Sequence, residues 1–201
     1  MTIKQKVEAV EKLFNSLDQE ISRFKSFTGI YCYSSCGKCC NKQDIEASPL
    51  EFLPLAFHWF KTGRAQEFYD KLENNQSLNC IVYSPLSILD QNQGSCSEYP
   101  YRGLICRLFG YGANRDKYGE LRLLTCKLIK DGQIENYTKA IVLLKNNVKV
   151  PVFTEYYQKL MQIDFQLARD ILPINKAIKI ALETVMQYYA YRPYSSGKGA
   201  A

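Results

Sequence analysis

The sequence is poor in histidine and has no long apolar run. Its 201 residues contain one histidine, His58, so a metal site in this chain must be built from thiolates instead of imidazoles. A single histidine among aromatic residues is more often a packed helix residue than a ligand or general base, and we expect that role for His58. The longest purely apolar stretches, such as Ile141 to Leu144, span a few residues, which predicts no membrane-spanning helix.

The N-terminal residues lack the features of a secretory signal. The segment MTIKQKVEAVEKLF carries charges throughout, with no uninterrupted apolar region and no small-residue cleavage site, so we expect a cytoplasmic, reducing location. The chain is long enough to bury a core without covalent staples. Its eight cysteines therefore favour metal or redox chemistry, and a disulfide framework is the less favoured alternative.

Half of the cysteines lie within nine residues, in the stretch Cys32-Tyr-Ser-Ser-Cys36-Gly-Lys-Cys39-Cys40. Two residues separate Cys36 from Cys39, the spacing at which a tight turn can direct both sulfurs at one ion, and Gly37 can adopt the positive φ of such a turn. Cys32 adds a third ligand. Cys40 differs, because the side chains of adjacent residues diverge, which indicates a second ion, a polynuclear cluster or a free thiol.

The formal charge of +6 suggests a nucleic-acid partner only if the thiols are neutral. Metal-bound thiols are deprotonated, and two zinc ions held by eight thiolates would add four negative charges and lower the balance to +2. A nucleic-acid-binding module is therefore the least favoured of the alternatives. The residues that a nucleic-acid-binding zinc module would use are basic and aromatic: Arg107, Tyr111, Arg115, Lys117 and Tyr118.

Apolar periodicity predicts helices at both ends of the chain. The N-terminal helix, expected over 2–26, carries a narrow apolar seam that either packs on the rest of the domain or binds a protein partner as a coiled coil. Two C-terminal helices are expected within 152–191, and Asp164 and Glu183 on or near their stripes are candidate buried acids. The seam of the N-terminal helix consists of Ile3, Val7, Val10, Phe14, Leu17, Ile21 and Phe24.

The centre of the chain predicts shorter elements. Ser48 and Pro49 mark a helix start with capping-box residues, and a second helix is expected from about Arg64 to Asn74. A strand is expected from Glu120 to Cys126, after a glycine-rich hairpin region from Gly110 to Gly119. No internal repeat and no long linker divides the sequence.

The expected fold is therefore mainly α, as one domain over 1–201. Its centre, 32–126, is expected to be an irregular, cysteine-rich metal-binding core that contains a short hairpin. Helices flank this core at both ends.

The second group of cysteines begins with Cys80 and continues as Cys96-Ser-Glu-Tyr99-Pro-Tyr-Arg102-Gly-Leu-Ile-Cys106-Arg107-Leu-Phe109. Cys96 and Cys106 are too far apart for a local chelating turn, so they need intervening structure in order to converge. Tyr99 could supply it by packing, and Arg102 by hydrogen-bonding loop carbonyls or thiolates.

Together the two groups resemble the bacterial cysteine-cluster family called CxxCxxCC, which is described as zinc- or iron-chelating. The second part of its motif reads C-x-x-Y-x-x-R-P-x-x-C-R-x-F. This chain keeps the pattern except that Gly103 replaces the proline, and its first cysteine pair is spaced C-x3-C instead of C-x2-C. The resemblance covers roughly Cys32 to Gly110, with Cys126 as a further member. The candidate metal ligands are then Cys32, Cys36, Cys39, Cys40, Cys80, Cys96, Cys106 and Cys126.

Three classes of function remain open. The first is a metal-binding protein that holds zinc or an iron–sulfur cluster, such as [4Fe–4S]. The second is a methylase or redox enzyme, because Cys32-x3-Cys36-x2-Cys39 has the spacing of radical S-adenosylmethionine enzymes and the resembled family includes proteins described as flagellin lysine N-methylases. The sequence lacks the strand–helix repeat of their barrel, and it assigns no catalytic residue. The third is the nucleic-acid module.

Overall fold

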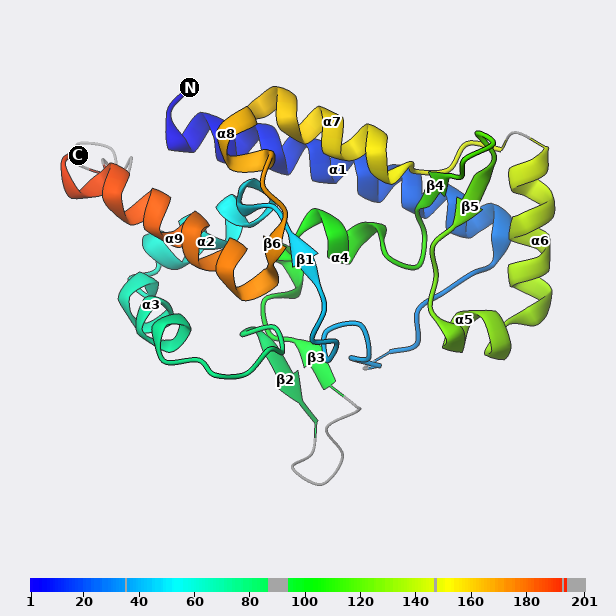
Figure 1. Cartoon of the computed structure of the whole chain (residues 1–201), viewed down its shortest axis with the longest axis horizontal. Helices are drawn as coiled ribbons and strands as arrows, with labels where there is room; N and C mark the ends of the chain where they lie inside the picture. The colour runs from blue at the N-terminus through cyan, green and yellow to red at the C-terminus, as the bar shows by residue number, and fades with distance from the viewer. Residues whose placement is uncertain (35, 87–93, 147, 193, 195–201) are drawn as a thin grey trace, which may run out of the picture.

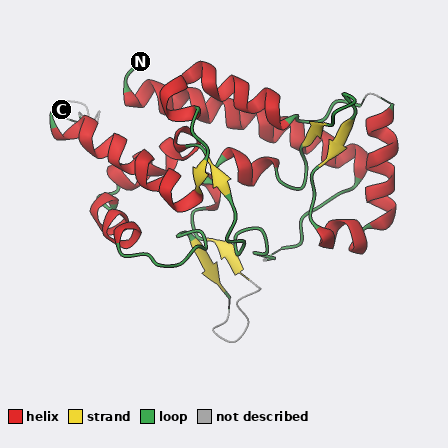
Figure 2. Cartoon of the chain, in the orientation of Figure 1, coloured by secondary structure: helices red, strands yellow, loops and turns green. Residues whose placement is uncertain are grey.

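The computed structural model describes residues 1–34, 36–86, 94–146, 148–192 and 194. The chain is mainly helical (Figure 1 and Figure 2), as the sequence predicts. Within these ranges no helix is long and apolar enough to cross a bilayer. The helices are α1 (Ile3–Thr28), α2 (Leu53–Lys61), α3 (Ala65–Glu73), α4 (Leu104–Leu108), α5 (Lys127–Gly132), α6 (Ile134–Lys145), α7 (Phe153–Ile163), α8 (Phe165–Ala168) and α9 (Ile174–Ala190), with 3-10 turns η1 (Pro49–Phe52) and η2 (Tyr99–Tyr101).

The strands are short, and those described form three antiparallel pairs (Figure 2). The expected hairpin after Gly110 is present, but its second strand is shorter than predicted. It ends at Leu123, and Cys126 already occupies the N-cap position of α5, without a side-chain capping hydrogen bond. The pairs are β1 (Glu46–Ala47) with β6 (Leu172–Pro173), β2 (Tyr83–Pro85) with β3 (Gly94–Cys96), and β4 (Ala113–Arg115) with β5 (Leu121–Leu123).

The N-terminal helix is confirmed as α1. Thr2 and Gln5 form a capping box, in which the Gln5 amide donates to Thr2 Oγ1 at 3.2 Å and the Thr2 amide donates to Gln5 Oε1 at 2.8 Å. Gly29 ends the helix with φ 77°, and its amide donates to Lys25 O. All seven residues of the apolar seam are buried within the chain, where α1 contacts α2, α4, α6 and α7.

The helix predicted at Pro49 begins as the 3-10 turn η1 and continues as α2. Pro54 accounts for the break, because it has no amide hydrogen to donate to the carbonyl of Leu50, so a regular α-helix begins only at Leu53. Gly63 follows the end of α2 with φ 74°. The predicted second helix is confirmed as α3 and the two C-terminal helices as α7 and α9.

Two hydrophobic clusters share α1 (Figure 1). The larger one packs α2, α3, α9 and η1 against the first two-thirds of α1. The smaller one lies at the C-terminal end of α1, where Phe24 and Ile30 pack with residues of α5, α6, β4 and β5. The cysteine segments therefore connect two separately packed ends of the molecule.

Candidate metal centre

The first cysteine segment leaves α1 and runs toward β3 (Figure 1). Gln133, next to α5, holds its start: Gln133 Nε2 donates to Tyr31 O at 2.7 Å, and Gln133 Oε1 accepts from the Tyr31 amide at 3.1 Å. The Cys32 amide donates to the Tyr111 hydroxyl at 2.9 Å. This end of the segment is thus fixed by residues about 80 to 100 positions away in the sequence.

The predicted turn at Gly37 is confirmed. Gly37 has φ 58°, and its carbonyl accepts from the amides of Cys40 at 2.9 Å and Asn41 at 3.0 Å. A Cβ atom at Gly37 would lie 2.7 Å from the carbonyl oxygen of Gly94 in β3. Glycine is therefore required both by the backbone angle and by the close approach of the two cysteine segments.

The second segment carries Cys80 into the larger hydrophobic cluster. Asn79 Nδ2 donates to Asn41 Oδ1 at 2.7 Å, which ties the residue before Cys80 to the residue after Cys40. The Tyr83 amide donates to Cys80 O at 2.9 Å, and β2 pairs Tyr83 with Cys96 in β3. Cys80 is 8% exposed.

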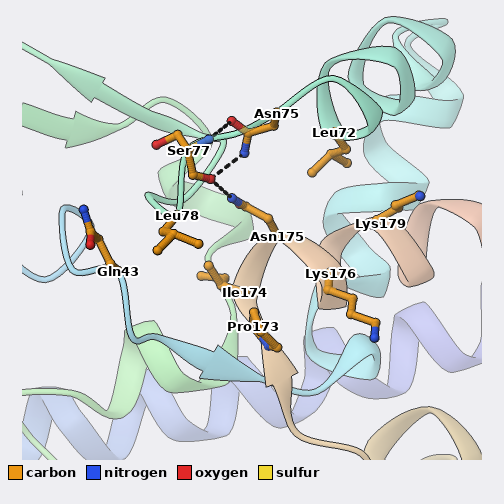
Figure 3. Close-up of a pocket in the computed structure, with 10 residues that line it drawn as sticks. All are labelled: Gln43, Leu72, Asn75, Ser77, Leu78, Pro173, Ile174, Asn175, Lys176 and Lys179. Atoms are coloured by element: carbon orange, nitrogen blue, oxygen red, sulfur yellow. Dashed lines mark hydrogen bonds between the residues drawn. The ribbon is translucent and has the colours of Figure 1, made fainter.

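Asn175, at the start of α9, positions the Cys80 segment. Its Oδ1 accepts from the Ile81 amide at 2.8 Å, and its Nδ2 donates to Asn79 O at 2.8 Å and to Ser77 O at 3.4 Å. Asn175 and Ser77 line a hollow of about 270 Å³ between the segment and α9. Figure 3 shows the hydrogen bond between them. No sequence pattern points to Asn175, because its partners lie about 95 residues away.

Cys106 lies on the short helix α4, whose start is held by the buried carboxyl of Glu51. Glu51 Oε2 accepts from the Ile105 amide at 2.8 Å, while Oε1 accepts from the Ser48 amide at 2.7 Å and the Tyr157 hydroxyl at 3.3 Å. Burial raises the pKa of Glu51 to about 7, against the opposing effect of these donors. The capping box predicted at Ser48 is confirmed, but its second role at α4 is visible only in the structure.

Gly103 departs from the resembled motif, which has proline at this position. A Cβ atom there would lie 2.7 Å from the Phe52 ring and 2.8 Å from Glu51 Oε2. The close packing of α4 on η1 therefore accounts for glycine at this position.

The two arginines of the motif connect α4 to α1 through Asp18. Arg107 is 7% exposed, forms an ion pair with Asp18, lies over the Phe14 ring at 4.6 Å and donates to the carbonyls of Arg102 and Pro100. Arg102 has a nitrogen 3.8 Å from Asp18, and its guanidinium covers the Tyr99 ring at 4.1 Å. Tyr99 therefore packs as predicted, against the guanidinium of Arg102. The hydrogen bonds to loop carbonyls expected of Arg102 are made by Arg107 instead, and Arg102 Nε has no partner among the described residues.

All eight cysteines are free thiols. Sγ of Cys39 and Sγ of Cys40 are 4.0 Å apart, about twice the length of a disulfide bond. The hydrogen bond that they share favours the thiolate at Cys39 and the thiol at Cys40, so it lowers the pKa of Cys39 and raises that of Cys40. Burial opposes the first shift and adds to the second.

The remaining thiols lie close enough for their charges to act on one another. Burial raises the pKa of Cys32 to about 11, and charges on Cys39, Cys36 and Cys126 add to this. Burial likewise raises the pKa of Cys80 to about 12, with smaller contributions from Cys96 and Cys39.

Burial raises the pKa of Cys106, and the charges on Cys80, Glu51, Cys39 and Cys96 raise it further. The positive charge of Arg102 acts in the opposite direction and lowers the pKa of Cys32, Cys39 and Cys96. Arg102 therefore lies within electrostatic range of Cys32 and Cys39 in the first segment and of Cys96 in the second.

The thiols are a suitable donor type for zinc or iron, but they are not arranged as a complete coordination sphere. In the part of the chain that the structure describes, no three Cys, His, Asp or Glu side chains form a group that could hold a metal ion. Three buried polar atoms near the thiols lack a hydrogen-bond partner: Arg102 Nε, Asn79 Oδ1 beside Cys80, and Thr125 Oγ1 beside Cys126. Arg102 Nε–H is a donor, and a metal-bound thiolate is an acceptor that would satisfy it.

The other candidate residues have structural roles. His58 stacks on Tyr101, with ring centroids 4.2 Å apart, and burial lowers its pKa. Asp164 caps α8 through the Leu167 amide at 3.1 Å and forms an ion pair with Lys6. Oε1 of Glu183 lies 3.9 Å from Nζ of Lys179, which is one turn earlier in α9.

The basic and aromatic residues proposed for nucleic acid do not form one exposed surface. Arg107 is buried in its ion pair, and the Tyr111 hydroxyl is bonded to the Cys32 amide. Arg115 donates to Gly119 O within the β4–β5 hairpin at 3.1 Å, while Tyr118 is exposed.

Residues 31–127 match the model of a known family, CxxCxxCC, described as "Putative zinc- or iron-chelating domain". This segment, 97 of the 201 residues, therefore carries the CxxCxxCC domain. The matched range begins one residue before Cys32 and ends one residue after Cys126, so it contains all eight cysteines. No curated protein and no solved structure matches the chain.

Proposed function

We propose that this CxxCxxCC protein binds zinc or iron through its clustered cysteine thiolates in the cytoplasm. The observation that supports this most strongly is the convergence of thiols from four sequence segments, held by the Gln133, Asn41–Asn79 and Glu51 contacts. Sulfur donors without imidazole suit zinc and iron–sulfur clusters alike. The proposed ligands are drawn from Cys32, Cys36, Cys39, Cys40, Cys80, Cys96, Cys106 and Cys126.

The surrounding residues would stabilise the anionic thiolates. Arg102 supplies positive charge and an unpaired N–H donor near three of the thiols. Asp18 and Tyr99 fix its position. Zinc bound here would supply a structural or transferable ion, and an iron–sulfur cluster would supply electron transfer or the binding of S-adenosylmethionine.

The test is anaerobic purification followed by metal analysis, acid-labile sulfide analysis and a visible spectrum. Cys36→Ser should lose metal, because it removes half of the chelating turn, whereas His58→Ala should keep the full metal content as the matched control. A metal-free chain with native disulfides would contradict the proposal.

An iron–sulfur enzyme that uses S-adenosylmethionine is the second candidate, as in flagellin lysine N-methylase-like proteins. The observation that favours it is the single loop that carries Cys32, Cys36 and Cys39. In this loop, charges on Cys36 and Cys39 raise the pKa of Cys32. A brown protein with iron and sulfide would favour this candidate, and a colourless zinc protein without sulfide would exclude its radical form.

A further inference from the structure

The thiols of Cys39 and Cys40 are in direct contact. Their Sγ atoms lie 4.0 Å apart and share a hydrogen bond, and both side chains are free thiols. We propose that this pair is an oxidation site, at which a hydroperoxide oxidises the Cys39 sulfur and Cys40 then closes a reversible disulfide with it. This inference goes beyond the proposed metal binding, because it concerns the reactivity of the two thiols and not their role as ligands.

The pair lies on a turn whose backbone is held at both ends. The Gly37 carbonyl accepts from the amides of Cys40 and Asn41, and Asn41 Oδ1 accepts from Asn79 Nδ2 at 2.7 Å. Both thiols are partly exposed. A small oxidant such as hydrogen peroxide can therefore reach a pair of sulfurs that the turn already holds side by side.

The hydrogen bond gives the two sulfurs different roles. One thiol must donate to the other, and the accepting sulfur has the greater thiolate character. Backbone groups of Cys39 and Cys40 and the positive charge of Arg102 all favour Cys39 as the acceptor. Thiolates are the nucleophilic form of cysteine, and redox-sensitive thiolates often have a resolving thiol beside them. Cys39 is thus suited to attack the oxidant, and Cys40 to resolve the product.

The reaction consumes one hydroperoxide for each disulfide formed. The Cys39 thiolate attacks one peroxide oxygen, the O–O bond breaks, and hydroxide leaves, so that the sulfur is oxidised to a sulfenic acid and the peroxide is reduced. The Cys40 sulfur then attacks the sulfenic sulfur, the S–O bond breaks, and water leaves with the Cys40 proton. With hydrogen peroxide, the hydroxide takes up a proton from solution, and the net products are one disulfide and two waters.

The short link between the two residues should make this disulfide easy to reduce. Adjacent Cα atoms are about 3.8 Å apart across a trans peptide, which is closer than the roughly 4.4–6.8 Å usual for a disulfide. The described peptide bonds are trans. A disulfide across such a link is strained, and strained disulfides are the labile ones. Oxidation of the pair should therefore be reversed by a mild thiol reductant.

Exposure alone would favour a different cysteine. Cys32 is exposed, whereas Cys39 and Cys40 are only partly so. A disulfide also requires a second sulfur within reach, and the contact between Cys39 and Cys40 provides it without a rearrangement of distant segments. We therefore expect this pair to close a disulfide before any other two cysteines of the chain do.

The sequence allows this pair to be followed separately from the other thiols. Trypsin cuts after Lys38 and Lys42, so both thiols fall in the peptide 39–42, while the peptides 103–107 and 123–127 each carry one cysteine. The full chain as purified is treated with limiting hydrogen peroxide, alkylated and digested without reductant. We expect the peptide 39–42 to lose both alkyl groups and two hydrogen atoms, and the other two peptides to stay alkylated. Incubation with glutathione before alkylation should restore both groups.

Single substitutions test the two roles. Cys40→Ser should stop at the sulfenic acid of Cys39, which dimedone captures, whereas Cys39→Ser should leave Cys40 alkylated. His58→Ala, which removes no thiol, is the control and should form the disulfide like the native chain. Because the native chain supplies the main readout, the test does not depend on the folding of either cysteine variant.

The outcomes separate this proposal from metal binding. An alkylated peptide 39–42, equal oxidation of all the cysteine peptides, or a disulfide from Cys39 to a cysteine other than Cys40 would each overturn the oxidation site. The prediction holds for the chain as purified, whatever metal it carries. Metal analysis of the same sample decides the proposed function on its own, because the mass of peptide 39–42 reports only on its two sulfurs.

Discussion

The helical frame and the cysteine segments of this protein are held by different forces. In the frame, α1, α2 and α9 bury continuous apolar stripes against one another. In the cysteine segments, the fixed points are polar contacts between distant residues, such as Tyr31 with Gln133, Asn41 with Asn79, and Ile81 with Asn175. The contrast is sharpest for the first cysteine loop, because none of residues 31–34 and 36–45 is buried.

This difference predicts that the centre depends on metal. Each intramolecular hydrogen bond contributes only about 1 kcal/mol, whereas each ordered loop residue costs about 1–2 kcal/mol of backbone entropy. A few long-range contacts therefore do not compensate for ordering the loop. The proposed metal–thiolate bonds would supply the missing stabilisation, and the frame needs none of them.

Metal removal should produce the largest effect. Structural zinc contributes roughly 10 kcal/mol to folding in small zinc domains, so we expect amides of residues 30–41 and 94–106 to lose hydrogen-exchange protection first. Amides of α1 and α9 should retain part of theirs. Uniform protection before and after chelation would show that the centre folds as independently as the frame.

A mutation that creates a cavity in the frame should lower the stability of the protein without changing its metal content. Leu17 is fully buried in α1, so Leu17→Ala should lower the free energy of unfolding by about 3 kcal/mol and leave metal content unchanged. Gln19→Ala, on the exposed face of the same helix, should change it by less than about 0.5 kcal/mol. Denaturant unfolding and metal analysis measure both variants, and metal loss in Leu17→Ala would erase the distinction between the two regions.

Glu51 joins the frame to the centre and should make stability depend on pH. The pKa of the folded state is raised from 4.5 to about 7, so this carboxyl stabilises the fold fully below its unfolded pKa and loses that contribution as pH rises through 7. At most this amounts to about 3 kcal/mol. Glu51→Gln should therefore be less stable than the native chain at pH 5, by about 1–3 kcal/mol for its misplaced donor, with a smaller deficit at pH 8.

Urea unfolding of the native protein and of Glu51→Gln at several pH values measures this difference. Subtracting one curve from the other removes the shared contribution of the thiols. Glu183→Gln is the control, because that carboxyl pairs with Lys179 only at 3.9 Å and near the surface. A deficit that grows as pH rises would contradict the raised pKa of Glu51.

Asn175→Ala should have the smallest effect. It removes an acceptor and a donor from the Cys80 segment, which should cost about 1–2 kcal/mol and raise amide exchange only around residues 79–83. Asn74→Ala, which removes a side-chain bond to Asp70 O at the exposed end of α3, is the matched control. Equal exchange in the two variants would show that Asn175 does not position the segment.

The sequence was sufficient to predict the helices of the frame wherever apolar residues recur at helical spacing. The apolar stripe predicted this helix over 2–26, within two residues of its observed bounds Ile3–Thr28. α5 and α6 were not predicted. In α6 the apolar residues Ile134 and Val142 are 65% and 52% exposed, so the buried positions do not stand out as a stripe.

For the candidate metal centre, the sequence identified the cysteines together with Tyr99 and Arg102, but not the residues that hold the cysteine segments in place. Spacing located the turn at Gly37, because its hydrogen bonds close within four residues. The β1–β6 pair has two residues per strand, too few to show a pattern. The sequence did not reveal the contacts of Asn175, of Tyr111 or of Glu51 with α4. These contacts join residues 54 to 94 positions apart, and local periodicity carries no information about them.

X-ray absorption at the metal edge of the purified protein tests the central claim most directly. The account predicts a first shell of about four sulfur atoms per metal near 2.3 Å, with no imidazole contribution, in the native chain and in His58→Ala alike. A shell of nitrogen and oxygen ligands, or a shell that changes in His58→Ala, would contradict a thiolate centre.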